Sequence, residues 1–459
     1  MPIRQPLQNL NNKTLVALAV LLLSILASFP LANTNWAQVK SLGLGWMTVA
    51  QYISASLAMI IVWRFGPQSN RWRDYVTLLI FAIAIRLFLV PVDTYTSNDV
   101  DRYMFDGKVA LSGYDPYRVN HNAPELETLR QTWPTPEEHA KYPTLYPPAA
   151  IGLYALSAAS GSEYAELVWK FLSFVASSLT VVIMMLVLKG IGKLKHFSLV
   201  AFSPILIFEA GVGAHIDAFS SLVVSAALLA YQRKNFALSG MAIAFGALSK
   251  LMPILLLIPL FFSMNKLSHA LKFALAAVIT VAAGYLIVLS LGMQAIGSTP
   301  VFFEKWRNAA PLFDALSLVL SGYYLLAFIV ATLFISFCLN VIWTWKHSPS
   351  TESNTLLAVT PALQWILIVP LLLSPVVFPW YLMVLVPLFA LRPTFFLAAW
   401  FSLLPLSYLV LNQFACCHIW APLEWTNYLL AVGLVLGLIL DQLYLSCNTT
   451  ESCNHGQLA

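Results

Sequence analysis

The stretch TLVALAVLLLSILASFPLA, from Thr14 to Ala32, contains no charged residue and is typical of a membrane-spanning helix. A helix needs about 20 mostly apolar residues to cross the hydrocarbon core of a bilayer, so this run has the length of one membrane span. The apolar core of a cleavable signal peptide is shorter, and we expect this segment to remain in the protein as a membrane anchor.

The composition extends this interpretation to the whole chain. Charged residues make up 10% of the 459 residues, hydrophobic residues make up 59%, and the mean hydropathy is +0.77. Soluble domains contain roughly 25% charged residues, which excludes a soluble multidomain enzyme, a disordered chain and a nucleic-acid-binding module. A membrane β-barrel would show alternating segments of about 10 residues rather than long apolar runs. The sequence therefore predicts an all-α, polytopic integral membrane protein with about 11–14 transmembrane helices.

Further apolar runs place the predicted helices. We expect them near 14–32, 43–63, 75–92, 164–188, 197–212, 216–231, 236–249, 251–263, 270–292, 316–343, 355–373, 379–391, 394–411 and 426–446. The segments 236–249 and 251–263 are short for a span and meet at Lys250. Interrupted helices at membrane depth are tolerated where they line a cavity within the protein.

The basic residues predict the orientation of these helices. If the N-terminus is inside, the short inner connections hold most of the 25 basic residues, as the positive-inside rule requires. These are Arg4, Lys13, Arg64, Arg71, Arg73, Lys189, Lys193, Lys195, Arg233, Lys234, Lys266, Lys272, Lys346 and Arg392. Counting 146–160 as a span would reverse this pattern, so we interpret it as a short helix on the outer face.

Four segments follow from this topology. Residues 1–92 form the first three transmembrane helices, and 93–163 form an extracytoplasmic loop with interfacial helices. Residues 164–446 complete the transmembrane bundle, and 447–459 form a cytoplasmic tail. The five cysteines have the spacing of neither a disulfide framework nor a zinc site.

The first outer loop concentrates the acidic residues. It holds nine of the twenty in the chain, namely Asp93, Asp99, Asp101, Asp106, Asp115, Glu125, Glu127, Glu137 and Glu138. A solvated surface explains Glu125 through Glu138 adequately. Loops held by a rigid scaffold are also where binding and catalytic residues gather, and residues 99–112 of this loop are candidates for such a role.

Helical spacing separates polar from apolar side chains over residues 99–112. The polar face would carry Asp99, Arg102, Tyr103 and Asp106, and another face would carry Val100, Met104 and Leu111. Such a helix would lie at the membrane interface, with its apolar side toward lipid and its charged side toward a cavity. The carboxylates and the arginine are either a weak surface ion pair or a proton acceptor and a phosphate ligand.

Other polar groups are predicted at the same face. Glu209 lies in or at the end of an apolar run, where an ionisable side chain is a functional candidate. His215 and Asp217 follow it in a glycine-containing turn, and two such ligands are too few to define a metal site. Trp380 and Tyr381 are either interfacial anchors or a surface that binds ligand.

These residues carry a resemblance to a known superfamily. The motif DVDRYMFDG (Asp99–Gly107), followed by GYDPY (Gly113–Tyr117), resembles the first outer loop of GT-C glycosyltransferases. The most similar pattern is that of bacterial polyprenyl-phosphate-mannose-dependent mannosyltransferases. Weaker similarities follow in the same order at Tyr146–Pro148, Glu209 with Gly213–Asp217, Lys250 with Pro253, and Pro379–Tyr381.

The resemblance implies a GT-C-like membrane transferase that moves a hexose, with mannose favoured, from a polyprenyl-phosphate donor to an extracytoplasmic hydroxyl. An aspartate early in the loop would be the general base of an inverting reaction without a metal or other cofactor. By position this is Asp99, although an aspartate at Asp101 departs from the pattern and keeps both residues as candidates. The candidate substrate-binding residues are Arg102, Tyr103, Asp106, Tyr117, Tyr146, Glu209, His215, Asp217, Lys250, Arg307, Trp380 and Tyr381.

The expected partners are the lipid-linked donor, membrane lipid, and a glycan, lipid or protein acceptor, in a bacterial plasma membrane. The alternative is a secondary transporter or lipid flippase, because these proteins also use broken helices and charges at membrane depth. That alternative predicts repeated halves and acids buried within the spans, whereas the acids here cluster in one outer loop.

Overall fold

The computed structural model describes residues 10–32, 43–137, 139–294, 296–298, 301, 304–347, 355–417 and 419–455. In this part of the chain the regular secondary structure is helical, and one isolated β-bridge joins Asn308 to Val376. The predicted all-α class is therefore confirmed.

The α-helices are numbered in chain order. They are α1 (Asn12–Leu26), α2 (Ser28–Ala32), α4 (Leu44–Phe65), α5 (Val76–Phe88), α6 (Asp99–Leu111), α7 (Glu127–Arg130), α8 (Pro148–Ala158), α9 (Ala165–Gly190), α10 (Ser198–Ala201), α11 (Pro204–Gly211), α12 (Asp217–Gln232), α13 (Phe236–Ser249), α14 (Leu257–Phe262), α15 (Leu267–Ser290), α17 (Pro311–Val319), α18 (Gly322–His347), α19 (Thr355–Leu372), α20 (Val386–Leu391), α21 (Phe395–Leu403), α22 (Leu411–Cys417) and α23 (Glu424–His455). The 3-10 segments used below are η5 (Met252–Leu256), η7 (Pro379–Leu385) and η8 (Leu404–Val410).

Eight helical segments of the described chain are long and apolar enough to cross a membrane. They are Asn12–Ala32, Leu44–Phe65, Ala165–Gly190, Leu194–Gly211, Leu267–Ser290, Gly322–His347, Phe395–Phe414 and Glu424–Ser446. Five more apolar segments are shorter, among them the two that meet at Lys250. The polytopic membrane class is confirmed, and the total of 11–14 spans stays a prediction.

Side-chain caps mark where several helices begin. The Asn11 side chain accepts a hydrogen bond from the Thr14 backbone N–H at 2.8 Å, and Asn235 caps α13 in the same way. Thr394 caps α21. Each cap pairs a backbone N–H that the first turn of a helix leaves without an internal partner, so these short polar residues fix the helix starts between apolar runs.

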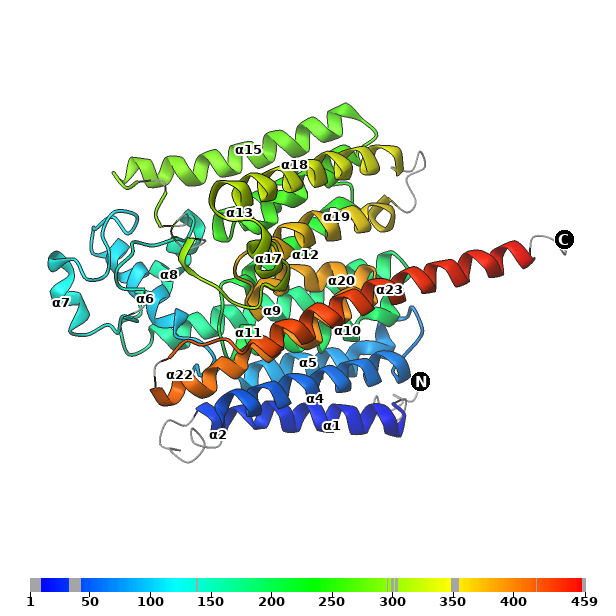
Figure 1. Ribbon diagram of the computed structural model, residues 1–459, viewed down its shortest axis with the longest axis horizontal. Helices are drawn as coiled ribbons and strands as arrows, with labels where there is room; N and C mark the ends of the chain where they lie inside the picture. The colour runs from blue at the N-terminus through cyan, green and yellow to red at the C-terminus, as the bar shows by residue number, and fades with distance from the viewer. Residues whose placement is uncertain are drawn as a thin grey trace, which may run out of the picture.

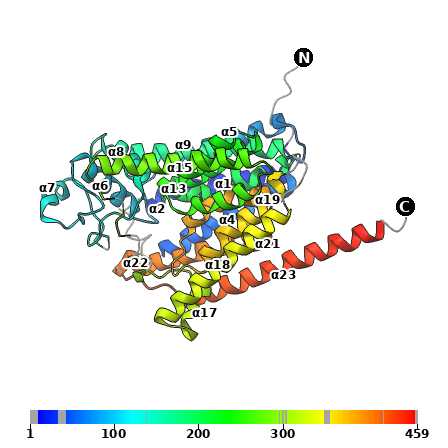
Figure 2. The same ribbon diagram turned by 90° about the horizontal axis from the view of Figure 1, so that it is seen from above.

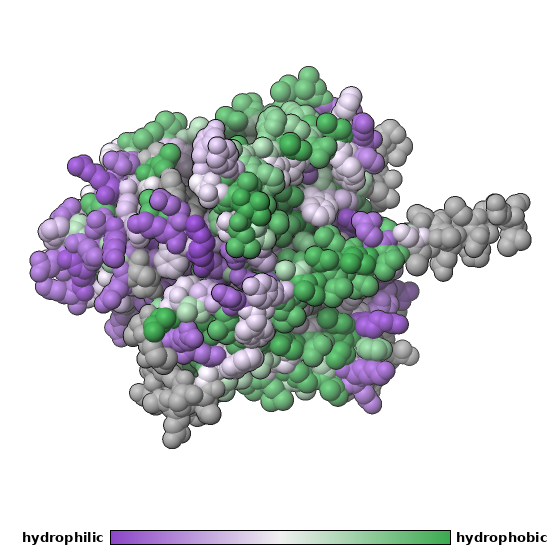
Figure 3. All heavy atoms as spheres, viewed as in Figure 1, coloured by the Kyte–Doolittle hydropathy of each residue, from purple (hydrophilic) through white to green (hydrophobic). Residues whose placement is uncertain are grey.

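The long helices lie side by side as a bundle (Figures 1 and 2). α1 begins and α23 ends at one end of this bundle, whereas α6, α7 and α8 gather at the other end (Figure 1). Hydrophilic residues cover the end that carries α7, and apolar residues cover much of the sides (Figure 3). This distribution is what a bilayer around the middle of the bundle requires.

Burial divides the bundle into inner and outer helices. The segment Leu194–Gly211 is almost wholly buried, and α12 packs against α9, α13 and η7. By contrast, α18 is almost wholly exposed along its apolar length. The inner helices therefore form the protein core, and α18 presents its side chains to the surroundings of the bundle. α23 continues to His455, beyond the expected end of the last span at 446.

The expected helix over 99–112 exists as α6, but its predicted lipid-facing side is wrong. Val100 and Met104 are buried, because α6 packs closely against α8. A Cβ on Gly107 would contact the backbone carbonyl of Tyr154, so glycine allows this approach. Leu111 alone of the predicted apolar face is exposed. The short outer helix expected over 146–160 is α8 (Pro148–Ala158), and it covers α6.

Candidate active site

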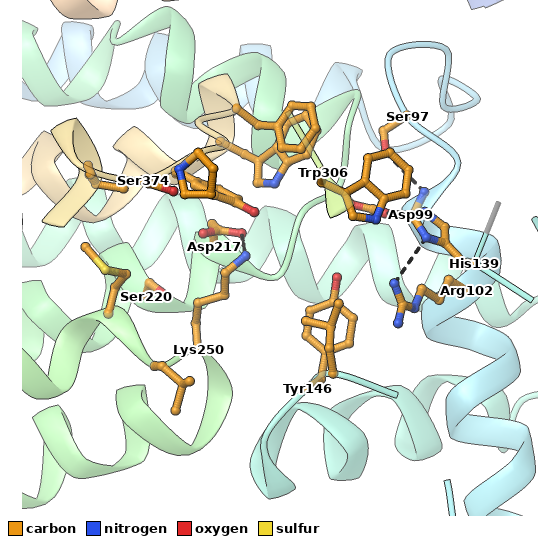
Figure 4. Close-up of a pocket in the computed structure, with 18 of the residues that line it drawn as sticks. Ser97, Asp99, Arg102, His139, Tyr146, Asp217, Ser220, Lys250, Trp306 and Ser374 are labelled. Atoms are coloured by element: carbon orange, nitrogen blue, oxygen red, sulfur yellow. Dashed lines mark hydrogen bonds and ion pairs between the residues drawn. The ribbon is translucent and has the colours of Figure 1, made fainter. Parts of the chain in front are cut away.

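One cavity of about 1070 Å³ opens near the end of the bundle that carries α6. Its wall combines residues of the first outer loop with residues of α12, η5, α18, α19 and η7. Figure 4 shows Asp99 and Arg102 on one side of this space and Asp217 and Lys250 on another. The cavity thus joins segments that lie far apart in the sequence.

Asp99 is the first residue of α6, and its carboxylate lies on the cavity wall. Its side chain is 14% exposed, so a ligand in the cavity can reach it. Burial alone would raise the pKa of this carboxyl group. The neighbouring His215, His139 and Arg102 outweigh burial and hold the pKa of Asp99 well below its usual range. The carboxylate therefore stays ionised at neutral pH.

His139 connects the loop to this carboxylate. Its Nε2 lies 3.6 Å from Oδ1 of Asp99, and its Nδ1 lies 3.3 Å from Nη1 of Arg102. The imidazole also stacks on Trp306, with ring centroids 5.4 Å apart. All four residues line the cavity, and together they make its polar end.

Lys250 and Asp217 form an ion pair on another part of the wall. Nζ of Lys250 donates to Oδ2 of Asp217 at 2.9 Å, and it lies 4.7 Å from the centre of the Tyr381 ring. Lys250 is the C-cap residue that follows α13, at the break before η5. Its side chain is 18% exposed, whereas that of Asp217 is 4% exposed. The break thus presents a cation to the cavity, and the more deeply buried aspartate balances its charge.

Aromatic rings complete the wall. Tyr146 lies below the guanidinium of Arg102, with 5.6 Å from the guanidinium carbon to the ring centre. Phe378 and Trp380 stack with their centroids 4.3 Å apart, and Trp420 contacts Phe378 edge-on at 6.0 Å. Trp380 is only 7% exposed and faces the cavity, which favours a surface that binds ligand over an interfacial anchor.

Half of the predicted site residues lie on this wall and half do not. Asp99, Arg102, Tyr146, Asp217, Lys250, Trp380 and Tyr381 line the cavity. The described residues Asp101, Tyr103, Asp106, Tyr117, Glu209, His215 and Arg307 are not part of its lining.

Several of the second group have partners within the protein. Asp106 is 1% exposed, and it accepts hydrogen bonds from Thr144 at 2.7 Å and binds His121 at 2.7 Å, so it holds the loop onto α6. Tyr103 stacks on Tyr154 of α8, with centroids 4.5 Å apart. Nη1 of Arg307 donates to the backbone carbonyl of Trp306.

Glu209 and His215 lie behind the wall. Both side chains are fully buried, and His215 stacks on Trp380 at 3.8 Å between ring centroids. Oε1 of Glu209 accepts hydrogen bonds from the hydroxyls of Tyr52 at 2.5 Å and Tyr408 at 2.7 Å. These residues support the wall from the bundle side.

Sequence analysis did not identify His139 as a site residue, nor Trp306 as a wall residue. His139 has no regular spacing to Asp99 and reaches it only through the fold of the loop. Among the described residues, no three His, Cys, Asp or Glu side chains are grouped so as to hold a metal ion.

The described chain is thus a multi-pass bundle of apolar helices, and its cavity holds a carboxylate, a lysine and stacked aromatic rings. The family model for the alpha-(1->6)-mannopyranosyltransferase N-terminal domain matches residues 11–265, more than half of the chain, and the chain belongs to this family. No curated protein and no solved structure matches the chain.

The family assignment confirms the expected resemblance. The protein is a membrane mannosyltransferase, and a transporter or flippase is not supported. The matched range includes α6, the turn before α12 and Lys250, whereas Trp306, Trp380 and Tyr381 lie beyond it.

Proposed function

We propose that the protein transfers mannose from a polyprenyl-phosphate carrier to an acceptor hydroxyl at the outer face of a bacterial plasma membrane. One observation supports this most directly: a single cavity contains the Asp99 carboxylate and also reaches the exposed surface of α18. A donor with a sugar and a long apolar tail needs both a reactive polar end and an apolar opening.

The apolar opening lies at α18. Leu326 of α18 lines the cavity and yet is 60% exposed, so the cavity meets the outer surface of the bundle there. Ile329 and Leu333 continue this apolar lining along α18. An isoprenoid tail could leave between these side chains into lipid, while its phosphate remains beside the ammonium group of Lys250.

The chemical step needs one base and one stabilised leaving group. The acceptor oxygen attacks the anomeric carbon and forms the new C–O bond, and its proton moves to Asp99. The bond from the anomeric carbon to the phosphate oxygen breaks, and its electron pair stays on the phosphate. Because the attack is a single displacement, the anomeric configuration inverts.

Lys250 is suited to the departing phosphate. A cation fixed near developing negative charge lowers the barrier more than it stabilises the bound donor. Arg102 is less available for this role, since it is 3% exposed and hydrogen-bonded to His139. We therefore assign Arg102 to orienting the polar end and Lys250 to the phosphate.

The acceptor would approach from the loop side. Trp306, His139 and Ser97 line the cavity near Asp99 and offer an aromatic surface with hydrogen-bonding groups. Sugar rings pack their C–H faces on such surfaces, so a glycan fits better than a lipid or protein acceptor. The extracytoplasmic location rests on the basic residues of the opposite connections.

Replacement of the proposed base tests this function. Asp99→Asn should lower mannose transfer from polyprenyl-phosphate mannose in membranes by about 10²–10⁴-fold, because an amide cannot take the proton from the attacking hydroxyl group. Asp101→Asn is the matched control and should retain most activity, since its side chain does not line the cavity. Wild-type turnover by Asp99→Asn would reject the assignment, and an unchanged anomeric configuration in the product would reject inversion.

A further inference from the structure

Buried polar side chains continue from Asp99 away from the cavity into the bundle. Oδ2 of Asp99 lies 3.3 Å from Nδ1 of His215, and Nε2 of His215 lies 3.5 Å from Oε2 of Glu209. His215 and Glu209 are both fully buried, and neither lines the cavity. They reach the cavity wall indirectly, through Asp99 and through the Trp380 ring that stacks on His215.

The turn that carries His215 is built for this contact. Ala214 has a φ of 46°, a left-handed conformation that is unfavourable for a residue with a Cβ. Nε1 of Trp169 donates to the Ala214 carbonyl at 2.7 Å and holds the turn. A Cβ on Gly213 would lie 2.6 Å from Nε2 of His215 and 3.2 Å from Oε2 of Glu209. Only glycine at this position lets the ring and the carboxyl group approach each other.

Contacts from three other segments fix the pair. The hydroxyl of Tyr408 contacts both carboxyl oxygens of Glu209, at 2.7 and 2.9 Å, and the hydroxyl of Tyr52 donates to Oε1. Trp380 stacks on the His215 ring from the cavity side. Burying a carboxyl group costs folding free energy, and hydrogen-bond partners such as these offset that cost.

We propose that His215 and Glu209 are positioning residues that share one proton and present an N–H group to Asp99, keeping the base ionised and correctly oriented. This inference rests on the proposed role of Asp99. The pair can be an imidazolium with a carboxylate or an imidazole with a carboxylic acid. Both forms carry the same net charge, and both place a proton on Nδ1, facing Asp99.

Other groups also act on the charge of Asp99. The charged or titratable neighbours are Arg102 and His139 at the polar end, and the Asp217–Lys250 pair across the cavity. The hydroxyl of Tyr103 lies 3.4 Å from Oδ2, and Tyr146 adjoins Arg102. His215 also contacts a second buried acid, since its Nε2 lies 3.5 Å from Oε2 of Glu209.

Two substitutions distinguish the role of His215 as a hydrogen-bond donor from its role in packing. His215→Phe keeps a ring against Trp380 but removes the N–H group. His215→Asn loses the ring but places an amide N–H near the position of Nδ1. The readout is the pH dependence of kcat/KM with polyprenyl-phosphate mannose and a mannose oligosaccharide as acceptor.

The proposal predicts that His215→Phe moves the acidic limb of the profile upward by about one pH unit or more. At a pH below both limbs, kcat/KM of the variant would be about tenfold lower than that of the wild type, and neutral pH would restore it, because each pKa unit is a factor of ten in ionised base. His215→Asn should keep its limb near that of the wild type. An unmoved limb in His215→Phe, or an equal shift in His215→Asn, would overturn the proposal.

A second variant covers the case in which His215→Phe fails to fold. Gly213→Ala pushes the ring away from Glu209 and should also move the acidic limb upward, whereas an unmoved limb would count against the shared proton. His196→Asn controls for the loss of a buried imidazole elsewhere, since Nδ1 of His196 binds the Ala390 carbonyl at 2.8 Å. Its limb should stay in place.

The outcome can be distinguished from a failure of the proposed function. If Asp99→Asn is active, the role of the base is wrong and this inference falls with it. If Asp99→Asn is inactive at every pH while His215→Phe keeps the wild-type limb, only the role of His215 and Glu209 is rejected.

Discussion

Lys250 is the residue that we propose to stabilise the departing phosphate. It lies between the Asp217 carboxylate and the Tyr381 ring and is exposed to the cavity. Lys250→Met keeps much of the side-chain volume and removes the charge. We expect kcat to fall by about 10²–10³-fold with a smaller change in the KM for donor, because the charge acts mainly on the departing phosphate.

A matched lysine provides the control. Lys305 is exposed and contacts the hydroxyl of Tyr142 at 3.1 Å, outside the cavity lining. Lys305→Met should leave kcat within about twofold of the wild type, as expected for an exposed charge. An equal fall in both variants would point to a general electrostatic effect and would contradict the specific role of Lys250.

The site residues show what spacing within the sequence can and cannot reveal. Asp99 and Arg102 are one helical turn apart, so the sequence predicted correctly that they share a face. His139 and Trp306 come together only because the loop folds over the cavity, and no local pattern encodes that contact. Asp106 matched the motif equally well, but its hydrogen bonds serve the loop instead of the cavity.

At the scale of elements, the packing of α6 on α8 positions Asp99, the proposed base. Gly107 allows the contact, because a Cβ there would collide with the backbone of Tyr154. Backbone cannot move aside as a flexible side chain can. Gly107→Ala should therefore destabilise the protein by about 1–3 kcal/mol and lower transfer activity, measured by thermal unfolding in detergent and by the mannose-transfer assay.

Gly152 in the middle of α8 is the matched control. A Cβ at Gly152 would contact no atom within 4 Å, so alanine adds no clash there. Alanine also favours a helix over glycine by about 1 kcal/mol, and Gly152→Ala should unfold at the wild-type temperature or above. A lower unfolding temperature for both variants would mean that the helices tolerate no alanine here, and the close-packing explanation would fail.

The helices themselves were largely predictable, whereas their surroundings were not. Hydropathy located α8 and the broken pair α13 and η5–α14, because each run differs sharply in composition from its neighbours. The helical spacing of polar and apolar residues located α6. The sequence placed the apolar side of α6 against lipid, since an amphipathic pattern does not say which apolar surface will cover it. In the structure that surface is α8.

At the scale of the whole molecule, the bundle separates its charged ends. The hydrophilic end with α6 and α7 lies opposite the end where α1 begins, and apolar side chains cover the region between them (Figures 1 and 3). A lipid-linked donor and a water-soluble acceptor would thus meet at one end of the protein. The side of the membrane on which the cavity opens therefore depends on the orientation of the whole bundle.

Cysteine labelling tests that orientation. Glu127 on α7 and Lys189 at the end of α9 are both exposed, at opposite ends of the bundle. In an active variant without the five native cysteines, a membrane-impermeant maleimide applied to intact cells should label Glu127→Cys and leave Lys189→Cys unlabelled until the membrane is opened. The reverse pattern would place the cavity at the cytoplasmic face, where an extracytoplasmic carrier could not deliver mannose to Asp99.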